Sequence, residues 1–240
     1  MMQIAIFYHC LFFGGDPPNI LPHACEVTCQ QMHQVERTGL LAAANEFTVG
    51  INGGAESEEI ASLMISPKAR RVMHGLESKN ENLTLVELEK WLPSHPGWLV
   101  LYFHAKGATR SSASEYDQYI AKWRACLMFH CISGWRSCVG TLENGYEAVG
   151  AHWMPCAGPA HNQNIFAGNF WWATSDYLRV LPSIYLRDRI RVSGIKSGES
   201  RYESEVWIGN GPRLPRVKDM HRARTRVCPF DPSRFMRTDR

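Results

Sequence analysis

The sequence predicts an α/β protein with a mostly parallel, twisted central sheet flanked by helices, and three observations support this. Apolar runs rich in β-forming residues alternate along the chain with segments of helical periodicity. The two strongest runs, at 3–12 and 97–103, show little polar alternation, which is typical of strands buried on both faces. The 240 residues are 45% hydrophobic and 20% charged, which is ordinary for a globular protein with a substantial core.

The expected elements follow one another in an alternating order. Strands are expected at 3–12, 46–52, 70–77 (weak), 97–103 and 146–153, and helices at 24–38, 56–65, 82–91 and 115–142. Ser57 is a plausible cap of the second helix, and Thr84 with Glu87 has capping-box spacing in the third. The long fourth helix is expected to bend near Gly134.

The stretch 164–182 carries the densest aromatic cluster. After a short apolar run, Gly168 and Asn169 precede Phe170, Trp171 and Trp172, and a helix is expected from 175 to a stop at 182, capped by residue 174 or 175. Two adjacent indoles beside a Gly-Asn pair can form an aromatic floor that a ligand approaches closely. Ordinary core packing is the alternative interpretation.

The charge is unevenly distributed, and this suggests a boundary near residue 211. Residues 212–240 carry nine Lys and Arg against three Asp and Glu, which leaves 17 basic and 20 acidic residues of the 26 and 23 in the chain. We therefore expect a domain over 1–211 and a basic tail or strap over 212–240. The tail either packs on the acidic body, reaches an anionic membrane surface, or holds nucleic-acid phosphates.

The eight cysteines form no CxxC pair and no Cys/His grouping with zinc-finger spacing. Cys25 and Cys29 are one helical turn apart, and we interpret them as small buried residues on one helix face. His152, His161 and Asn162 also lack fixed ligand spacing, so no metal site is predicted. Reduced cysteines and an N-terminal apolar run too short for a membrane span predict a cytoplasmic protein without a transmembrane segment.

The loops after the carboxyl ends of parallel strands are the expected binding region. His104, Lys106 and Gly107 directly follow the strongest strand, where an ammonium and a backbone N–H can face a phosphate. Arg124, on the following helix, can add a bidentate phosphate contact. A solvated surface loop is the plainer interpretation. No Walker A and no G-x-G-x-x-G motif is present.

A second pair of candidates lies further along the chain. Glu203 and Glu205 flank Ser204 ahead of Val206-Trp207-Ile208, and a carboxylate there can act as a general base. The plainer interpretation is that this E-x-E motif lies on a solvated face of the protein.

The order of these motifs resembles a known family. The strand followed by H-x-K-G, the W-R helix, G-N-F-W-W-A and the later E-x-W-I-G resemble GT-A-type glycosyltransferases, most closely the rhamnan-synthesis-like transferases of polysaccharide biosynthesis. The resemblance covers 97–209, and its weight lies in motif order and spacing. It implies a single GT-A-like (Rossmann-like) domain, a nucleotide-sugar donor and a hydroxyl acceptor such as a glycan.

The resemblance also implies roles for single residues. Glu205, with Glu203 as substitute, would be the catalytic base, while His104, Lys106, Gly107 and Arg124 would hold the donor diphosphate. Gly168, Asn169, Trp171 and Trp172 would form the acceptor wall, with at least one indole reachable from solvent. The usual D-x-D is replaced by Tyr102-Phe103-His104-Ala105-Lys106. Lys106 and His104 would then supply the positive charge that the metal otherwise provides. Whether Mn²⁺ or Mg²⁺ also binds stays open.

Two other functions stay open at this point. One is transfer of the sugar to a nucleic acid held by the basic tail. The other is a non-catalytic carbohydrate-binding protein, because exposed tryptophan pairs suit sugar stacking without catalysis.

Overall fold

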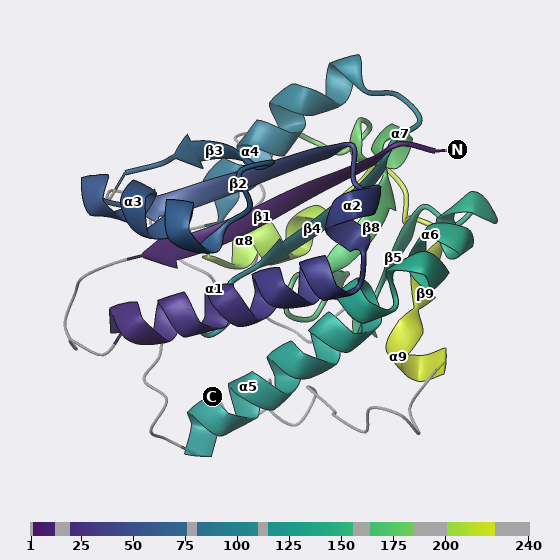
Figure 1. Ribbon diagram of the computed structural model, residues 1–240. Helices are drawn as coiled ribbons and strands as arrows, with labels where there is room; N and C mark the ends of the chain where they lie inside the picture. Colours follow the sequence, from purple (N-terminus) through teal and green to yellow (C-terminus); the bar gives the residue numbers. More distant parts are fainter. Residues whose placement is uncertain are drawn as a thin grey trace.

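The computed structural model describes residues 2–12, 20–75, 81–109, 115–155, 164–184 and 201–223, excluding the side chains of 20, 115–117, 201–203 and 222–223. Its centre is a seven-stranded sheet (Figure 1). In spatial order the strands are β3 (Arg70–Met73), β2 (Glu46–Gly53), β1 (Ile4–Phe12), β4 (Leu99–His104), β8 (Trp171–Thr174), β5 (Ala148–Gly150) and β9 (Val217–Asp219). A two-stranded ribbon, β6 (Trp153–Met154) and β7 (Ile165–Phe166), forms a separate sheet.

The central sheet is mostly parallel, as the sequence predicts. β3, β2, β1 and β4 pair in parallel, as do β5 and β9, whereas β8 runs antiparallel between β4 and β5. All nine residues of β1 are buried, which confirms the strand buried on both faces. The parallel strands therefore end at one common edge of the sheet, where His104 closes β4.

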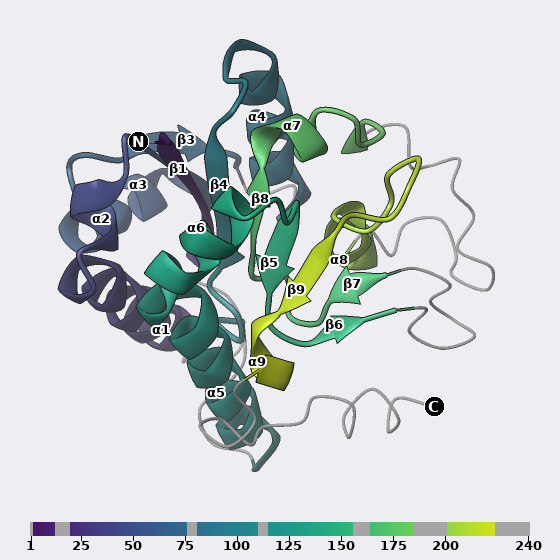
Figure 2. The same ribbon diagram turned by 90° about the vertical axis from the view of Figure 1, so that its right-hand side faces the viewer.

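Helices cover both faces of the sheet (Figure 2). One face is covered by α1 (Ile20–Arg37), α2 (Leu40–Ala43), α3 (Ala55–Met64), α5 (Glu115–Met128), the π-helical turn η2 (Phe129–Ser133) and α6 (Trp135–Glu143). The other face is covered by α4 (Asn82–Trp91), the short η1 (Leu92–Ser94), α7 (Ser175–Leu178) and α8 (Arg201–Trp207). Strand alternation divides the core accordingly, with Tyr8 and Phe103 on the first face and Phe7 and Tyr102 on the second.

Several local predictions are confirmed and others are wrong. The long helix does break near Gly134, through η2, and the Thr174 hydroxyl does cap α7 by accepting from the Tyr177 N–H. Thr84 and Ser57 cap nothing, because α4 begins after Glu81 and α3 after Gly54. Both hydroxyls instead bond across the fold, to His9 Nδ1 and to the Phe12 carbonyl respectively.

The described part of the basic tail belongs to the folded unit. β9 pairs with β5, and α9 (Met220–Ala223) follows it directly, so the boundary at residue 211 falls inside the sheet domain. Arg213 forms an ion pair with Glu147, and Arg216 lies 5.6 Å from the Tyr146 ring centre. These contacts agree with the expectation that the tail packs on the acidic body. Residues 224–240 lie outside the described part.

Among the helices that the structure describes, none combines the length and the apolar character needed to cross a bilayer. Six cysteines are described, and none of them forms a disulfide within the described part of the chain. Cys29 is exposed and Cys25 is half-buried, so the prediction that both are buried is wrong. Cys156 and Cys228 lie outside the described residues.

Candidate functional site

The turn after β4 is built to present its backbone at the carboxyl edge of the sheet. The Ala108 N–H donates to the Ala105 carbonyl, and Gly107 has a φ of 84°. This is a type II turn, whose third residue needs the left-handed conformation that glycine adopts freely. The Lys106 carbonyl accepts a 2.8 Å hydrogen bond from Arg124 Nη1 on α5. Because a trans peptide points its N–H opposite to its carbonyl, the Gly107 N–H faces away from α5.

The Lys106 ammonium lies above an aromatic face of α5. Its Nζ is 3.9 Å from the ring centre of Trp123, one residue before Arg124 on α5. A cation above an indole face is stabilised there without losing its charge. Lys106 is half-buried, so its charge lies near the protein surface at the carboxyl edge of the sheet.

Arg124 supports this turn, and its predicted contact with phosphate stays a prediction. Its side chain is buried, with 7% exposure, and its guanidinium bonds the Lys106 carbonyl. Burial lowers the pKa of Arg124, while Tyr8 and Glu26 oppose that shift, so the group stays charged at neutral pH. The guanidinium therefore holds the Lys106 carbonyl in place.

His104 is likewise a positioning residue. Its Nε2 donates to the Gly168 carbonyl at 3.0 Å, and its Nδ1 lies 3.4 Å from a carboxylate oxygen of Glu81. With both nitrogens engaged inside the fold, the ring is not free to donate to a phosphate. The prediction of a phosphate-binding His104 is therefore not supported by its geometry.

Glu81 is the residue that sequence reasoning missed. One carboxylate oxygen accepts from the Tyr102 hydroxyl at 2.6 Å, and the other accepts from the Ser204 hydroxyl at 3.0 Å. Together with its contact to His104, Glu81 ties β4 to α8. Its side chain is 10% exposed. The available signal was its place directly before the α4 helix, where a carboxylate favours the helix N-terminus.

The predicted acceptor wall is buried, and this corrects its proposed role. Trp171 and Trp172 both have 0% exposure, so the expectation that one is reachable from solvent is wrong. β8 lies between two other strands, and both of its faces are covered by helices, so alternation sends one indole into each core. Trp171 stacks on Tyr102 with ring centres 5.2 Å apart, and Trp172 Nε1 donates to the Cys131 carbonyl.

Gly168 and Asn169 are also buried, and Gly168 lies beside the Lys106 side chain. Asn169 has 0% exposure and an uncommon φ of 54°, and its Oδ1 accepts from Trp171 Nε1. Its Nδ2 finds no hydrogen-bond acceptor among the described residues. A non-glycine residue held in the left-handed region stores strain, which is characteristic of functional sites.

Gly168 is required by both its conformation and its surroundings. Its φ is 92°, and an added Cβ would lie 2.6 Å from Leu127 Cδ1 and 3.3 Å from Lys106 Cε. We expect Gly168→Ala to lower the free energy of unfolding by about 2–4 kcal/mol, as a left-handed alanine and an overpacked contact combine. Gly97→Ala is the matched control, since its φ of 74° is similar but nothing lies within 4 Å of its Cβ. Equal losses in urea denaturation would contradict the close packing at Gly168.

The two glutamates on α8 are only partly described. Glu205 is half-buried and adjacent to Ser204, whose hydroxyl bonds Glu81. The backbone of Glu203 lies in α8, and its side chain is outside the described residues, as are His161 and Asn162. α8 is thus anchored to the end of β4 through Glu81.

A buried histidine lies beside His104 in the sheet. His9 on β1 is in register with His104, and its Nδ1 lies 2.9 Å from the Thr84 hydroxyl. Burial lowers the pKa of His9 well below its usual range, and His104 and His74 lower it further. Burial also lowers the pKa of His104, although Glu81 opposes this, and the pKa of His74.

These shifts predict a pH dependence of stability. An imidazole whose pKa is depressed by folding binds a proton more readily when unfolded, so its stabilisation is present above pH 6.5 and lost below it. We expect the free energy of unfolding to fall from about pH 7 to about pH 5, by up to about 1.4 kcal/mol per pH unit for each proton. His9→Asn should reduce this slope, and His33→Asn, at an exposed position, should not. Equal slopes would contradict the buried neutral state of His9.

The end of β4 does not fit a hard divalent cation. Mg²⁺ and Mn²⁺ prefer oxygen ligands, whereas β4 ends at His104 and is followed by Ala105 and Lys106, none of which has a side-chain oxygen. The nearby Glu81 carboxylate already accepts two hydroxyl hydrogen bonds, and Lys106 supplies a positive charge of its own.

Several solved structures resemble this chain distantly, at low sequence identity. A protein from Desulfovibrio desulfuricans G20, described as a nucleotide-diphospho-sugar transferase, is 11% identical, with 85% of this chain and 74% of that chain covered at a TM-score of 0.42. A nucleotidyl transferase from a Methanothermobacter species is 12% identical, covering 84% and 80% at 0.38. The glucosyl-3-phosphoglycerate synthase of M. tuberculosis is 12% identical, covering 75% and 60% at 0.36. At these scores, the likenesses say nothing about what this chain binds.

No curated protein matches the sequence. A family match, in contrast, extends over residues 7–218 and so includes most of β1, the turn after β4, α8 and most of β9. Because this match spans most of the chain, the protein belongs to the family described as Domain of unknown function (DUF8361).

Proposed function

We propose that the protein is a glycosyltransferase that moves a sugar from a nucleotide-activated donor to a hydroxyl acceptor, most simply a glycan. The observation that carries this proposal is the type II turn at the end of β4. It places the Lys106 ammonium over Trp123 of α5, and a Gly107 N–H that faces away from α5, at the common carboxyl edge of the parallel strands. An ammonium and a backbone N–H donor within one turn can each bind an oxygen of a diphosphate.

The proposed reaction assigns a task to each group. The acceptor oxygen forms a bond to the anomeric carbon, the carbon–oxygen bond to the diphosphate breaks, and the electron pair leaves with the nucleoside diphosphate. Lys106 and the Gly107 N–H stabilise the charge that develops on the leaving group. Glu205 takes the acceptor proton, with Glu203 as its substitute. The anchoring of α8 through Ser204 and Glu81 supports this assignment.

The other two functions have less support. Carbohydrate binding without catalysis rested on exposed indoles, and Trp171 and Trp172 are buried. Binding of nucleic acid rested on the basic tail, of which Arg213 and Arg216 contact the body of the domain.

A thermal-shift panel tests the proposal. The full chain is heated with UDP, GDP or dTDP and with their sugar conjugates, with and without manganese. A ligand of the native state at about 100 times its Kd stabilises by about 2.7 kcal/mol, so at least one nucleotide should raise Tm by several degrees without metal. No shift with any nucleotide would contradict donor binding, and a shift only with manganese would contradict the metal-free diphosphate site.

A further inference from the structure

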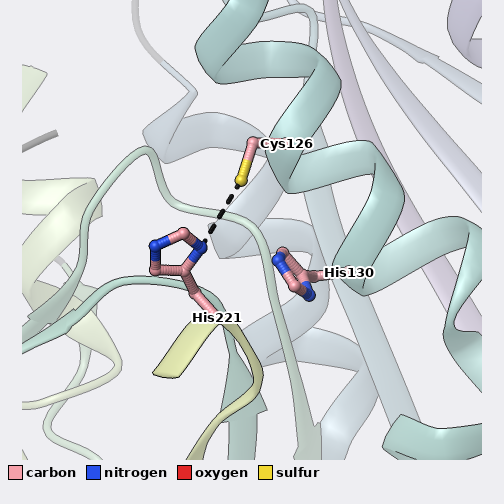
Figure 3. Close-up of side chains that lie close together, drawn as sticks. All are labelled: Cys126, His130 and His221. Atoms are coloured by element: carbon pink, nitrogen blue, oxygen red, sulfur yellow. Dashed lines mark hydrogen bonds between the residues drawn. The ribbon is translucent and has the colours of Figure 1, made fainter. Parts of the chain in front are cut away.

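A second cluster of reactive side chains lies at the ends of β5 and β9. Cys126, His130 and His221 each offer one ligand atom, and these atoms all lie within 4.8 Å of one another (Figure 3). Cys126 and His130 are buried, and His221 is half-buried. None of the three has a part in the proposed transfer reaction.

The helix geometry brings the first two ligands together. Cys126 and His130 are four residues apart, and side chains at this spacing lie on one helix face. The helix changes from α to π at Phe129, so His130 lies inside the π-helical turn η2. Such π-bulges occur frequently at functional sites.

The third ligand comes from a distant part of the chain. Asp219 ends β9 in register with Gly150 of β5, and α9 begins at the next residue. His221 Nδ1 thereby comes within 3.8 Å of Cys126 Sγ, 95 positions away in sequence.

His152 adds a fourth donor from the end of β5. Its Nε2 lies 3.5 Å from Cys126 Sγ, and its ring centre is 4.1 Å from that of His221. His152 has a φ of 61°, in the left-handed region that non-glycine residues rarely adopt. Strain of this kind persists where the surrounding structure imposes it, which is characteristic of ligand clamps.

One carboxylate holds the backbone of both C-terminal ligands. Asp219 Oδ1 accepts from the backbone N–H groups of His152 and His221, at 3.1 Å and 3.0 Å, and Oδ2 accepts from the Trp153 N–H at 3.0 Å. The two imidazoles are therefore fixed relative to each other by a common support. Preorganised ligands of this kind increase metal affinity.

The two sulfur–nitrogen separations at Cys126 are close to those of a tetrahedral transition-metal centre. With Zn–S near 2.3 Å and Zn–N near 2.0 Å, neighbouring ligand atoms lie about 3.3–3.6 Å apart. The two sulfur–nitrogen distances, 3.5 Å and 3.8 Å, are close to that spacing. A thiolate with imidazoles favours Zn²⁺ over Mg²⁺ or Ca²⁺, which prefer oxygen ligands.

We propose that Cys126, His130 and His221, whose ligand atoms lie within 4.8 Å of one another, bind one Zn²⁺, and that the neighbouring His152 completes a tetrahedral site. The Cys126 thiol releases its proton to solvent as the metal binds, and the three imidazoles bind as neutral donors. Four protein ligands leave no open position, so the ion is structural. It fastens β9 and α9 to α5, the helix that also carries Trp123 and Arg124 beneath the Lys106 turn.

The first test uses the wild-type chain, purified without a polyhistidine tag and with its thiols reduced. Elemental analysis should find about one zinc per chain, and removal by a chelator should lower Tm. Cobalt added to the metal-free protein should give the intense visible absorption of a tetrahedral site and a thiolate-to-cobalt band, saturating at about one equivalent. Weak absorption without a thiolate band would overturn the proposal, leaving Cys126 as a thiol bonded to imidazoles.

The second test uses ligand variants with matched controls. Cys126→Ser should abolish the thiolate-to-cobalt band, and His221→Asn should weaken cobalt binding at least tenfold. Cys29→Ser and His33→Asn remove one exposed thiol and one exposed imidazole elsewhere on α1, and should leave both measurements unchanged. If Cys126→Ser retains the band, or if the controls lose metal equally, the ion lies elsewhere and the proposal is wrong.

Discussion

Lys106→Ala should weaken the binding of a nucleoside diphosphate about 10- to 100-fold, and transfer activity at low donor concentration should fall in proportion. The expected loss corresponds to one hydrogen bond to a charged group, about 1.5–3 kcal/mol. Lys106 is half-buried above Trp123, so its contact with phosphate would be partly shielded from solvent and from salt. Isothermal titration calorimetry with the nucleotide that gives the largest thermal shift measures the change.

Lys122→Ala is the matched control for this substitution. Lys122 lies on α5 directly before Trp123 in the sequence, and it is exposed on the helix surface. Its removal changes the net charge equally and should leave Kd unchanged. An enzyme that needs millimolar manganese or magnesium and retains its activity in Lys106→Ala would contradict the proposed role of Lys106.

Glu205→Gln should lower the rate of sugar transfer by about 10²- to 10⁴-fold and leave nucleotide binding nearly intact. This range is the usual contribution of a general base. The amide preserves the size of the side chain, and so the α8 contact between Ser204 and Glu81 should survive. Single-turnover transfer and calorimetry on the same preparation separate the chemical step from binding.

Glu143→Gln is the control here, because it removes a carboxylate from the exposed end of α6. If nucleotide binding is lost together with transfer in Glu205→Gln, the residue has a structural role. Retention of activity in both Glu205→Gln and Glu203→Gln would remove the proposed base.

Local sequence patterns predicted the central strands because burial on both faces leaves an uninterrupted apolar run. The run at 3–12 corresponds to β1, and the strand ending at His104 is indeed central. The same patterns could not determine the role of Trp171 and Trp172. Their burial depends on β8 being inserted between β4 and β5, a long-range pairing that no local period encodes.

Of the candidate site, only the turn after β4 could be predicted from the sequence. Lys106 and Gly107 follow a recognisable strand end, so their place at the carboxyl edge follows from the topology. Glu81 meets Tyr102 and Ser204 across 21 and 123 residues of sequence, and Cys126 meets His221 across 95. Such contacts arise from tertiary packing, so spacing rules for motifs do not find them.

The most direct measurement of the central claim is protection of the Lys106 amine by a bound nucleotide. The wild-type chain is acetylated briefly with and without a saturating nucleoside diphosphate, and the modification of each lysine is quantified by peptide mass spectrometry. We predict that the nucleotide lowers acetylation of Lys106 several-fold and leaves exposed Lys122 unchanged. Unchanged acetylation of Lys106, under conditions where the same nucleotide raises Tm, would show that the diphosphate binds elsewhere.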